Sequence, residues 1–397
     1  MRILLIEDWN PLHGGAEAYT IQLKDALTEA GEEVRLLTAN VSTQAREIAD
    51  HLAPAFNHVL AKSLLQISNP FAAMAVRRAV QNFRPHVALV NMYALYLSPS
   101  AIFALDDIPY VLLVSDYKCI CPLGHRLLPD HSVCHHPVGI ACLRSGCLSL
   151  PHWLRDQLRY RRIDGVTRRA SAIVSTSDSL RGCLAEQGID SRRVYLFSNP
   201  PDPPLPRQAD PAPLFLFIGR LDIEKGVDTL LRAFAICHES LPEARLRIVG
   251  RGELRPSLER LASSLGVQDS VMFCGWQEPG GINHELSRAW ALVAPSRWPE
   301  PFGLVALEAI LRGVPAIVPA LGGLAETVEH GVTGLVFPAD DVRALSEQLI
   351  NVATGRCFPE HSLDPAQVAQ VQDLYSRDLH IAQIKAIMHE VVPSNDQ

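Results

Sequence analysis

The chain has 397 residues, which is too long for one ordinary hydrophobic core, so two domains are expected. An apolar fraction of 48% with 20% charged residues is typical of a globular protein, and the net charge of −7 argues against a nucleic-acid partner. No basic segment precedes a long apolar one, and no apolar run approaches the length of a membrane span. We therefore expect neither a signal peptide nor a transmembrane helix.

Short apolar runs alternate with helix-like segments in the first half, which predicts parallel α/β units. The predicted strands are residues 3–6, 33–37, 87–91, 110–114, 172–175 and 194–197. Prolines then crowd residues 199–206, a composition that favours a stiff, extended linker. We therefore expect an N-terminal domain at residues 1–198 and a linker at residues 199–213.

A second series of apolar runs predicts another parallel sheet after the linker. Its predicted strands are residues 214–218, 246–249, 271–274, 291–293, 316–318 and 334–337. This series defines a C-terminal domain at residues 214–364. The last segment, residues 365–397, is predicted to be helical and is long enough to pack back on the N-terminal domain.

The loop after the first predicted strand contains Gly14 and Gly15 and leads into a predicted helix. Paired glycines let a ligand approach the backbone closely, although an ordinary strand-to-helix turn has the same pattern. A dinucleotide fingerprint with three spaced glycines is absent at Gly250 and Gly252, because Arg255 stands at the third position. A nicotinamide cofactor is therefore not expected.

The predicted strand at residues 110–114 ends in Ser115 and Asp116, and Asp116 suits either a strand-end cap or a catalytic role. A cysteine-rich insertion follows, at about residues 116–150. Zinc prefers four nitrogen or sulfur ligands at short spacings, so a structural zinc ion is one interpretation, and disulfides are a lesser one. The candidate zinc ligands are Cys121, Cys134, Cys142 and Cys147.

Residues 153–169 carry six arginines and two aspartates, with aromatic and aliphatic residues between them. This pattern is typical of a solvated helix face. It also suits a docking surface for an anionic membrane or for a lipid-diphosphate acceptor. We expect a cytoplasmic protein, and on the second interpretation one that is peripheral on the inner face of the membrane.

Two cations follow the first strand of the second domain, where Gly219 precedes Arg220 and Lys225. An arginine offers a forked contact and a lysine a point charge, and this pair suits a diphosphate. As isolated residues they would be ordinary surface charges. Their place directly after a strand makes them candidates for phosphate binding.

Residues 295–309 read PSRWPEPFGLVALEA and contain the glutamates Glu300 and Glu308. The prolines on either side of Glu300 keep it out of a helix. A helix can begin near Gly303, and its first backbone amides would attract an anion such as phosphate. Glu308 has apolar neighbours, so it needs a partner such as a core arginine or the hydroxyl groups of a ligand.

Residues 295–309 resemble the signature of the retaining glycosyltransferases of the sucrose-synthase-like type (group 1, family 4). The segments at residues 219–226 and 250–253 and the Gly14-Gly15 loop agree with the same pattern. That family has the GT-B fold, in which two Rossmann-like domains with parallel sheets face each other across a donor cleft. The resemblance therefore implies this α/β fold.

The resemblance also implies a reaction, in which a nucleoside-diphosphate sugar gives its sugar to a glycan or lipid-linked acceptor with retention of configuration. No metal or other cofactor is implied for catalysis. Arg220 and Lys225 would stabilise the departing diphosphate, Glu300 would orient the sugar, and Glu308 would bind the ribose. Further residues expected to contact substrate are Gly14, Gly15, Ser115, Gly219, Gly250, Gly252, Phe302, Gly303 and Leu304.

Ser115 departs from the family pattern, because many relatives carry a histidine there, close to the 6-hydroxyl of the donor sugar. We expect either a donor with a different C5 substituent or compensation on the acceptor side. Two other functions stay open, a nucleotide-sugar 2-epimerase and a non-catalytic sugar-nucleotide-binding protein. The first needs an acid/base pair that the sequence does not identify, and intact Arg220, Lys225 and Glu300 argue against the second.

Overall fold

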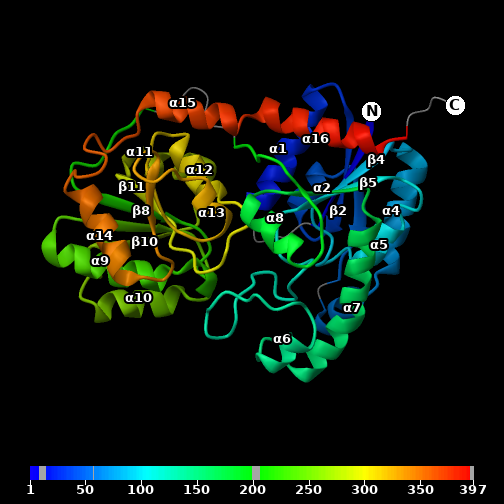
Figure 1. Cartoon of the computed structure of the whole chain (residues 1–397), viewed down its shortest axis with the longest axis horizontal. Coiled ribbons are helices and arrows are strands. Elements are labelled where there is room, and N and C mark those ends of the chain that lie inside the picture. Colours follow the sequence, from blue (N-terminus) through cyan, green and yellow to red (C-terminus); the bar gives the residue numbers. More distant parts are fainter. Residues whose placement is uncertain (9–14, 57, 199–205, 394–397) are drawn as a thin grey trace. The chain divides into compact units, whose positions relative to one another are not determined.

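The computed structural model divides the chain into two compact units, which are described separately (Figure 1). The structure describes residues 1–8, 15–56, 58–198 and 206–393. The first unit comprises Met1–Pro129, Cys134–Leu196 and Arg377–Gln397. The second unit comprises Asp130–Val133 and Phe197–Ser376.

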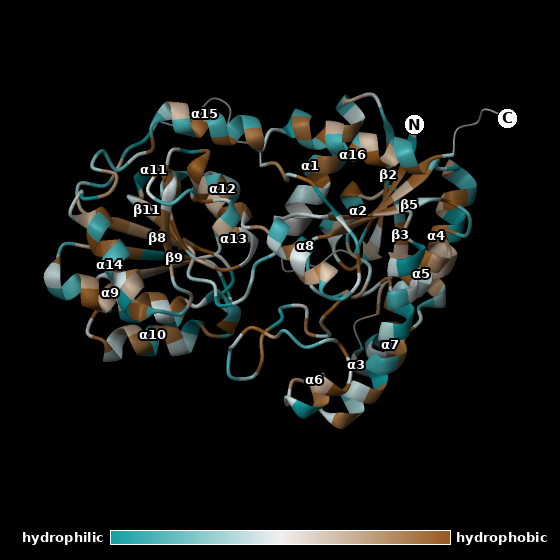
Figure 2. Ribbon diagram, viewed as in Figure 1, coloured by the Kyte–Doolittle hydropathy of each residue, from teal (hydrophilic) through white to brown (hydrophobic). Residues whose placement is uncertain are grey.

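The first unit is built on a seven-stranded parallel sheet with the strand order β3-β2-β1-β4-β5-β6-β7. Its strands are β1 (Arg2–Glu7), β2 (Glu33–Asn40), β3 (His51–Pro54), β4 (Val87–Val90), β5 (Tyr110–Val114), β6 (Ala172–Ser175) and β7 (Arg192–Arg193). The central strands β4 and β5 are buried throughout, because helices cover both faces of a parallel sheet of this kind. Figure 2 shows these strands as hydrophobic.

Nine helices belong to the described part of the first unit. They are α1 (Gly15–Glu29), α2 (Thr43–Ile48), α3 (Val59–Leu65), α4 (Pro70–Phe83), α5 (Pro99–Phe103), α6 (Ile140–Arg144), α7 (Leu150–Arg169), α8 (Asp178–Ala185) and α16 (Arg377–Val391). The last of these comes from the end of the chain and packs against α1 and β5. Its His380 is fully buried, with Nε2 2.7 Å from the hydroxyl of Tyr19. Helix α16 is therefore part of this unit's core.

The second unit has a six-stranded parallel sheet with the order β10-β9-β8-β11-β12-β13. Its strands are β8 (Leu214–Ile218), β9 (Arg245–Val249), β10 (Val271–Gly275), β11 (Ala291–Val293), β12 (Ala316–Pro319) and β13 (Gly334–Phe337). Its helices are the 3₁₀ helix η1 (Ile223–Lys225), α9 (Val227–Ser240), α10 (Arg255–Ser264), α11 (Pro279–Arg288), α12 (Leu304–Ile310), α13 (Gly322–Glu326), α14 (Val342–Ala353) and α15 (Pro365–Leu374). A core with Phe215, Phe217 and Phe234 joins the sheet to these helices.

Both sheets run outward from their first strand in the order of a doubly wound Rossmann-like sheet. The expectation of an α/β protein with two parallel sheets is therefore confirmed. In such sheets ligands bind at the carboxyl ends of the strands, where the strand order reverses. For the second unit that edge lies beyond β8 and β11, and for the first unit it lies beyond β1 and β4.

The predicted strand at residues 194–197 is wrong, because β7 is confined to Arg192–Arg193. The backbone of Tyr195 bonds instead to side chains of α16: its N–H donates to Gln383 Oε1 at 3.1 Å, and its carbonyl lies 2.8 Å from His380 Nδ1. Strand β3 was not predicted, since it has only four residues and ends in a proline. The predicted terminal helix is two helices, α15 and α16. Residues 199–205 of the predicted linker lie outside the described residues.

Candidate active site

Lys225 and Glu300, 75 positions apart in the chain, meet at one end of the second sheet. Lys225 ends η1, just after β8, and its Nζ lies 2.8 Å from Glu300 Oε1. The two side chains are only 17% and 10% exposed, so this is a largely buried ion pair. Arg220, also after β8, pairs with Asp222 and keeps 53% of its side chain exposed. The structure thus places one fixed and one accessible cation after the same strand.

The loop that carries Glu300 is braced by Arg297, which the sequence analysis did not single out. The Arg297 guanidinium makes two 2.7 Å bonds to Asp228 and a 2.8 Å bond to Asp340. Its backbone N–H donates to the carbonyl of Glu224 at 2.8 Å, which ties this loop to η1. A side chain on Gly226 would lie 2.1 Å from the carbonyl oxygen of Pro295, so only glycine permits this approach.

Glu300 itself accepts a hydrogen bond from the hydroxyl of Ser296 in addition to its contact with Lys225. Its backbone carbonyl accepts the N–H of Gly323 at 2.7 Å. The carboxylate is therefore fixed by two side chains and its backbone by a third contact. A group held this firmly can orient a hydroxyl without losing further conformational entropy of its own.

Glu308 lies in the short helix α12 and is half-buried. Burial raises the pKa of its carboxyl, while the charge of Arg312 and a hydrogen bond from Ser198 oppose that shift. Arg312 donates from Nη1 to the backbone carbonyl of Glu308 at 2.8 Å. The core arginine considered from the sequence is therefore present beside Glu308, and Glu308 stays a candidate ligand for hydroxyl groups.

The remaining predicted positions of the second unit lie on neighbouring loops. Gly250 has a φ of 145°, and a side chain there would lie 1.8 Å from the carbonyl oxygen of Gly219. The loop with Gly250 and Gly252 is thus pressed against the loop after β8, and close backbone packing accounts for glycine at Gly250. Phe302 is buried against Tyr375, Gly303 caps α12, and Leu304 begins it.

In the first unit, Ser115 and Asp116 line a pocket at the carboxyl ends of β4 and β5. The hydroxyl of Ser115 donates to Asn91 Oδ1 at 2.8 Å, and Asn91 Nδ2 donates to the buried Glu7 at 2.7 Å. The sequence analysis singled out Ser115 but missed its partners Asn91 and Glu7, which lie at the ends of the apolar strands β4 and β1. Gly14 lies outside the described residues, and Gly15 begins α1.

Asp116 forms an ion pair with Lys118, whose Nζ lies 3.1 Å from Oδ2. The carboxylate of Asp116 raises the pKa of Lys118. The backbone N–H of Lys118 also donates to Asp116 Oδ1 at 2.8 Å, as in a cap at the end of a strand. Asp116 thus caps the strand end and also forms a partly exposed ion pair, so its catalytic role stays a prediction.

Two family models match the chain, one in each half. The glycosyl transferase 4-like domain matches residues 14–200, and the glycosyl transferases group 1 domain matches residues 205–367. The chain belongs to the group 1 glycosyltransferases. Among its relatives, an uncharacterized glycosyltransferase of Methanocaldococcus jannaschii is 40% identical over 130 residues, which are 32% of this chain and 33% of that protein. The chain thus spans about a third of that relative's length.

Solved structures of glycosyltransferases share the fold of this family member. A sucrose-phosphate synthase from Thermosynechococcus elongatus superimposes with a TM-score of 0.73 at 22% identity, covering 98% of both chains. HepE from Anabaena, in complex with UDP and glucose, gives a TM-score of 0.71 at 19% identity, covering 98% of this chain and 100% of that one. The predicted GT-B-type pair of Rossmann-like domains and the predicted glycosyltransferase family are confirmed, and retention of configuration stays a prediction.

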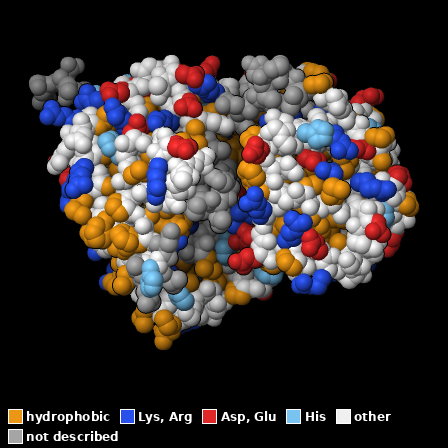
Figure 3. Space-filling view, turned by 180° about the vertical axis from the view of Figure 1, so that it is seen from behind, with side chains coloured by type: hydrophobic (Ala, Val, Ile, Leu, Met, Phe, Trp, Pro, Cys, Tyr) orange, Lys and Arg blue, Asp and Glu red, His pale blue; other side chains and the backbone are white. Residues whose placement is uncertain are grey.

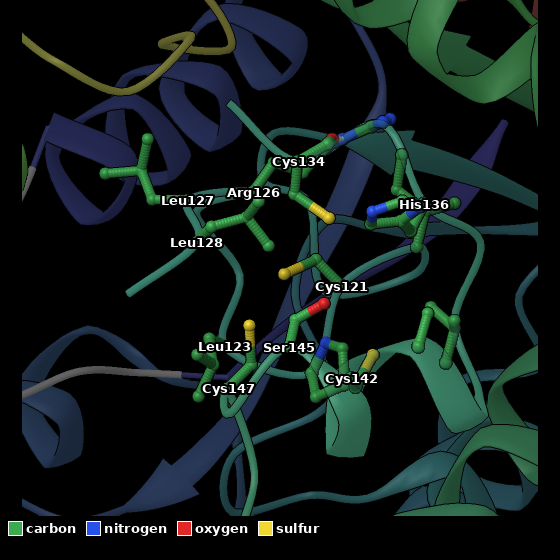
Figure 4. Close-up of a pocket in the computed structure, with 14 residues that line it drawn as sticks. Cys121, Leu123, Arg126, Leu127, Leu128, Cys134, His136, Cys142, Ser145 and Cys147 are labelled. Atoms are coloured by element: carbon green, nitrogen blue, oxygen red, sulfur yellow. Dashed lines mark hydrogen bonds between the residues drawn. The ribbon is translucent and has the colours of Figure 1, made fainter. Parts of the chain in front are cut away.

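The cysteine-rich insertion of this group 1 glycosyltransferase gathers its four predicted metal ligands around one pocket (Figure 4). As their side chains stand, no three histidine, cysteine, aspartate or glutamate residues in the described ranges are placed to hold a metal ion. The predicted zinc site therefore stays a prediction.

The arginine-rich segment predicted as a docking surface forms most of α7. Four of its arginines are engaged within the protein: Arg155 and Arg168 pair with neighbouring aspartates, Arg159 donates to the carbonyl of Ala94, and Arg169 lies over Phe103. Arg161 and Arg162 are exposed. Within the described residues, none of the helices combines the length and apolar character needed to cross a membrane.

Proposed function

We propose that this protein transfers a sugar from a nucleoside-diphosphate donor to an acceptor hydroxyl in the synthesis of a glycan, polysaccharide or glycolipid. The contact between Lys225 and Glu300, in a loop braced by Arg297, carries the proposal. It joins a phosphate-binding cation to a hydroxyl-binding carboxylate within the group 1 domain. The UDP bound to HepE, a protein of the same fold, supports a nucleotide donor.

The electrostatics of the second unit suit the departure of a diphosphate. Lys225 offers an ammonium group fixed by Glu300, and Arg220 offers an exposed guanidinium that can turn from Asp222 to a phosphate. Positive groups that are already in place stabilise developing negative charge without further reorganisation. We propose that Arg220 and Lys225 stabilise the negative charge of the departing nucleoside diphosphate.

The two carboxylates then bind hydroxyl groups rather than exchange protons. Glu300, which already accepts hydrogen bonds from two side chains, orients the sugar, and Glu308 accepts the ribose hydroxyls. In the first unit, Ser115 would contact the donor sugar, and Asp116, which lines the same pocket, is the candidate catalytic residue. We propose that transfer retains the anomeric configuration and that protein cations supply the charge that a catalytic metal would otherwise provide.

Product analysis tests this proposal. The purified protein is incubated with radiolabelled nucleotide sugars, with UDP-glucose first, and a panel of glycan and lipid-linked acceptors. We expect a labelled product and release of the nucleoside diphosphate that depends on acceptor, with the anomeric configuration read by NMR. Interconversion of the donor sugar without transfer would instead identify an epimerase, and binding without turnover would identify a non-catalytic protein.

The exposed face of α7 extends the proposal to the acceptor. Leu150, Leu154 and Leu158 recur one turn apart, and each is 55% exposed. Arg161 and Arg162 continue the exposed surface of the same helix. Figure 3 shows hydrophobic side chains gathered at the lower tip, where Figure 1 places α6 and the start of α7. An apolar stripe beside exposed arginines suits the surface of an anionic membrane.

We therefore propose peripheral contact with the inner face of a membrane and a lipid-linked acceptor. Vesicle co-sedimentation measures it, with phosphatidylcholine alone compared with a mixture that contains phosphatidylglycerol. Leu154→Glu should abolish sedimentation, and Leu374→Glu, at a similarly exposed leucine of the second unit, should leave it unchanged. Sedimentation that is independent of anionic lipid, or equal loss in both variants, would remove the membrane proposal and leave the transferase proposal intact.

A further inference from the structure

The insertion between β5 and α7 has little regular secondary structure, although Tyr117, Ile120, Leu127 and Leu148 are buried. Its residues 115–149 form no strand and contain one helix, α6, of five residues. α6 has no buried residue, so it contributes nothing to a hydrophobic core. A covalent or metal cross-link often holds segments with so little regular structure in one conformation.

Four thiols from separate parts of this insertion line the same pocket. They are Cys121, Cys134, Cys142 and Cys147. The first follows β5, the second lies in the irregular middle of the insertion, the third lies in α6, and the fourth lies just beyond it. Figure 4 shows the sulfur atoms of Cys121 and Cys134 directed toward the space between the lining segments. The pocket thus collects soft ligands from the whole length of the insertion.

A divalent metal suits such a cluster, because it binds cysteines as thiolates and displaces their protons.

Arg126, in the wall of the same pocket, supplies an independent observation. It is only 2% exposed, and neither Nη1 nor Nη2 makes a hydrogen bond within the described residues. It forms an ion pair with Glu186, whose Oε2 lies 3.6 Å from Nη2. Its Nε donates to the carbonyl of Cys134 at 2.8 Å, so the guanidinium is anchored beside a proposed ligand.

The ion pair with Glu186 leaves the Nη donors of Arg126 without a hydrogen bond, and buried donors call for an acceptor. A zinc ion with four thiolates carries net negative charge, and its sulfur atoms accept hydrogen bonds from donors around the metal. Arg126 is suited to that role. The four thiols and this guanidinium thus point to the same occupant.

We propose that Cys121, Cys134, Cys142 and Cys147 bind one zinc ion as thiolates and that the ion orders the insertion. Binding forms four zinc–sulfur bonds and releases the thiol protons to solvent, with no change of oxidation state. Because no three ligating groups in the described ranges are placed for a metal as they stand, the thiols must rotate toward the pocket. His136, which also lines the pocket, lies outside this ligand set.

An ordered insertion would also fix the positions of α7 and of the segment next to Asp116. The indole N–H of Trp153 in α7 donates to the carbonyl of Gly139 at 2.9 Å, and the hydroxyl of Tyr160 donates to the carbonyl of Lys118 at 2.7 Å. Lys118 is the partner of Asp116. The zinc ion would therefore hold the insertion against α7 and fix the segment that follows Asp116.

The metal content of the full chain, purified without added zinc and without an affinity tag that binds metal, tests the proposal. We expect about one zinc per chain by elemental analysis. Cobalt exchanged into the protein should give the intense thiolate charge-transfer and tetrahedral ligand-field spectrum of a four-sulfur site. Cys121→Ser and Cys142→Ser should lose the metal, whereas Cys183→Ser and His136→Ala should keep it.

Zinc well below a tenth of the chains in the wild-type protein, with all thiols reactive or paired as disulfides, would overturn the proposal. Zinc retained in both Cys121→Ser and Cys142→Ser would also overturn it. Loss of zinc in His136→Ala would replace the proposed ligand set and so refute it as stated. Should the cysteine variants fail to fold, the metal count and cobalt spectrum of the wild-type protein still decide, and neither readout depends on transferase activity.

Discussion

Replacement of Lys225 by alanine separates a catalytic role from a structural one. The variant removes the ammonium that lies 2.8 Å from Glu300, whose side chain is 10% exposed in the native protein, and leaves Ser296 as the remaining side-chain partner of that carboxylate. A largely buried charge that loses its counter-ion is destabilising. We expect a loss of about 3 kcal/mol in the free energy of unfolding.

The effect on turnover is expected to exceed what this destabilisation causes. If Lys225 stabilises the departing diphosphate, its removal should lower kcat by about 10²- to 10³-fold, as the loss of one donor to a developing oxyanion does. Glu300→Gln should lower kcat as well, because the amide orients a sugar hydroxyl less well. Since the two side chains touch, the double variant should lose less than the two single losses combined, with a coupling energy of about 1–3 kcal/mol.

Three assays test this prediction: initial rates with the best donor of the panel give kcat, thermal unfolding gives stability, and calorimetric titration gives the affinity for UDP. Lys24→Ala is the control, because Lys24 forms an ion pair of 2.7 Å with Asp50 in the first unit, with side chains 23% and 26% exposed. It should lose stability with little change in kcat. If Lys225→Ala unfolds earlier but keeps kcat within twofold and binds UDP normally, Lys225 is a structural residue and our assignment is refuted.

Three further outcomes are expected. Arg297→Ala should cost about 1–2 kcal/mol of stability, because it removes a buried guanidinium from Asp228 and Asp340, whose side chains are 30% and 49% exposed and so are partly solvated. Arg297→Lys should recover only part of the loss in a denaturant titration, since lysine lacks the forked geometry. Burial lowers the pKa of His380 to about 4 from 6.5, so the unfolded chain binds a proton at a higher pH than the folded chain does. The free energy of unfolding should therefore fall by up to about 3 kcal/mol as the pH drops from 6.5 to 4. His380→Gln should lack that part of the pH profile. In a donor panel, Ser115→His should shift preference toward ordinary hexoses, and an unchanged preference would show that Ser115 does not contact the sugar.

Much of the fold was predictable because buried parallel strands are short, continuous apolar runs, and these stand out from the helices between them. The bend at Glu300 was predictable for a local reason, since prolines flank it. The failures at residues 194–197 and at β3 are also physical. An apolar run that packs under α16 looks like a strand until the partners of Tyr195 are known.

The candidate site was predictable only in its parts. Arg220, Lys225 and Glu300 can be chosen from local patterns, but the contact between Lys225 and Glu300 depends on the order in which β8 and β11 lie in the sheet. Arg297 carries no local signal, because its two aspartate partners are distant in the chain. The link from Ser115 through Asn91 to Glu7 joins three strand ends and needs the folded sheet.

The membership of α16 in the first unit affects how the protein is made. His380, Ile384 and Met388 are buried in that unit although they lie near the end of the chain. A ribosome therefore releases all of the second unit before it supplies the helix that closes the core of the first. The domain that emerges first is completed last, and a cut within α16 would damage the first unit rather than the second unit, which precedes this helix in the chain.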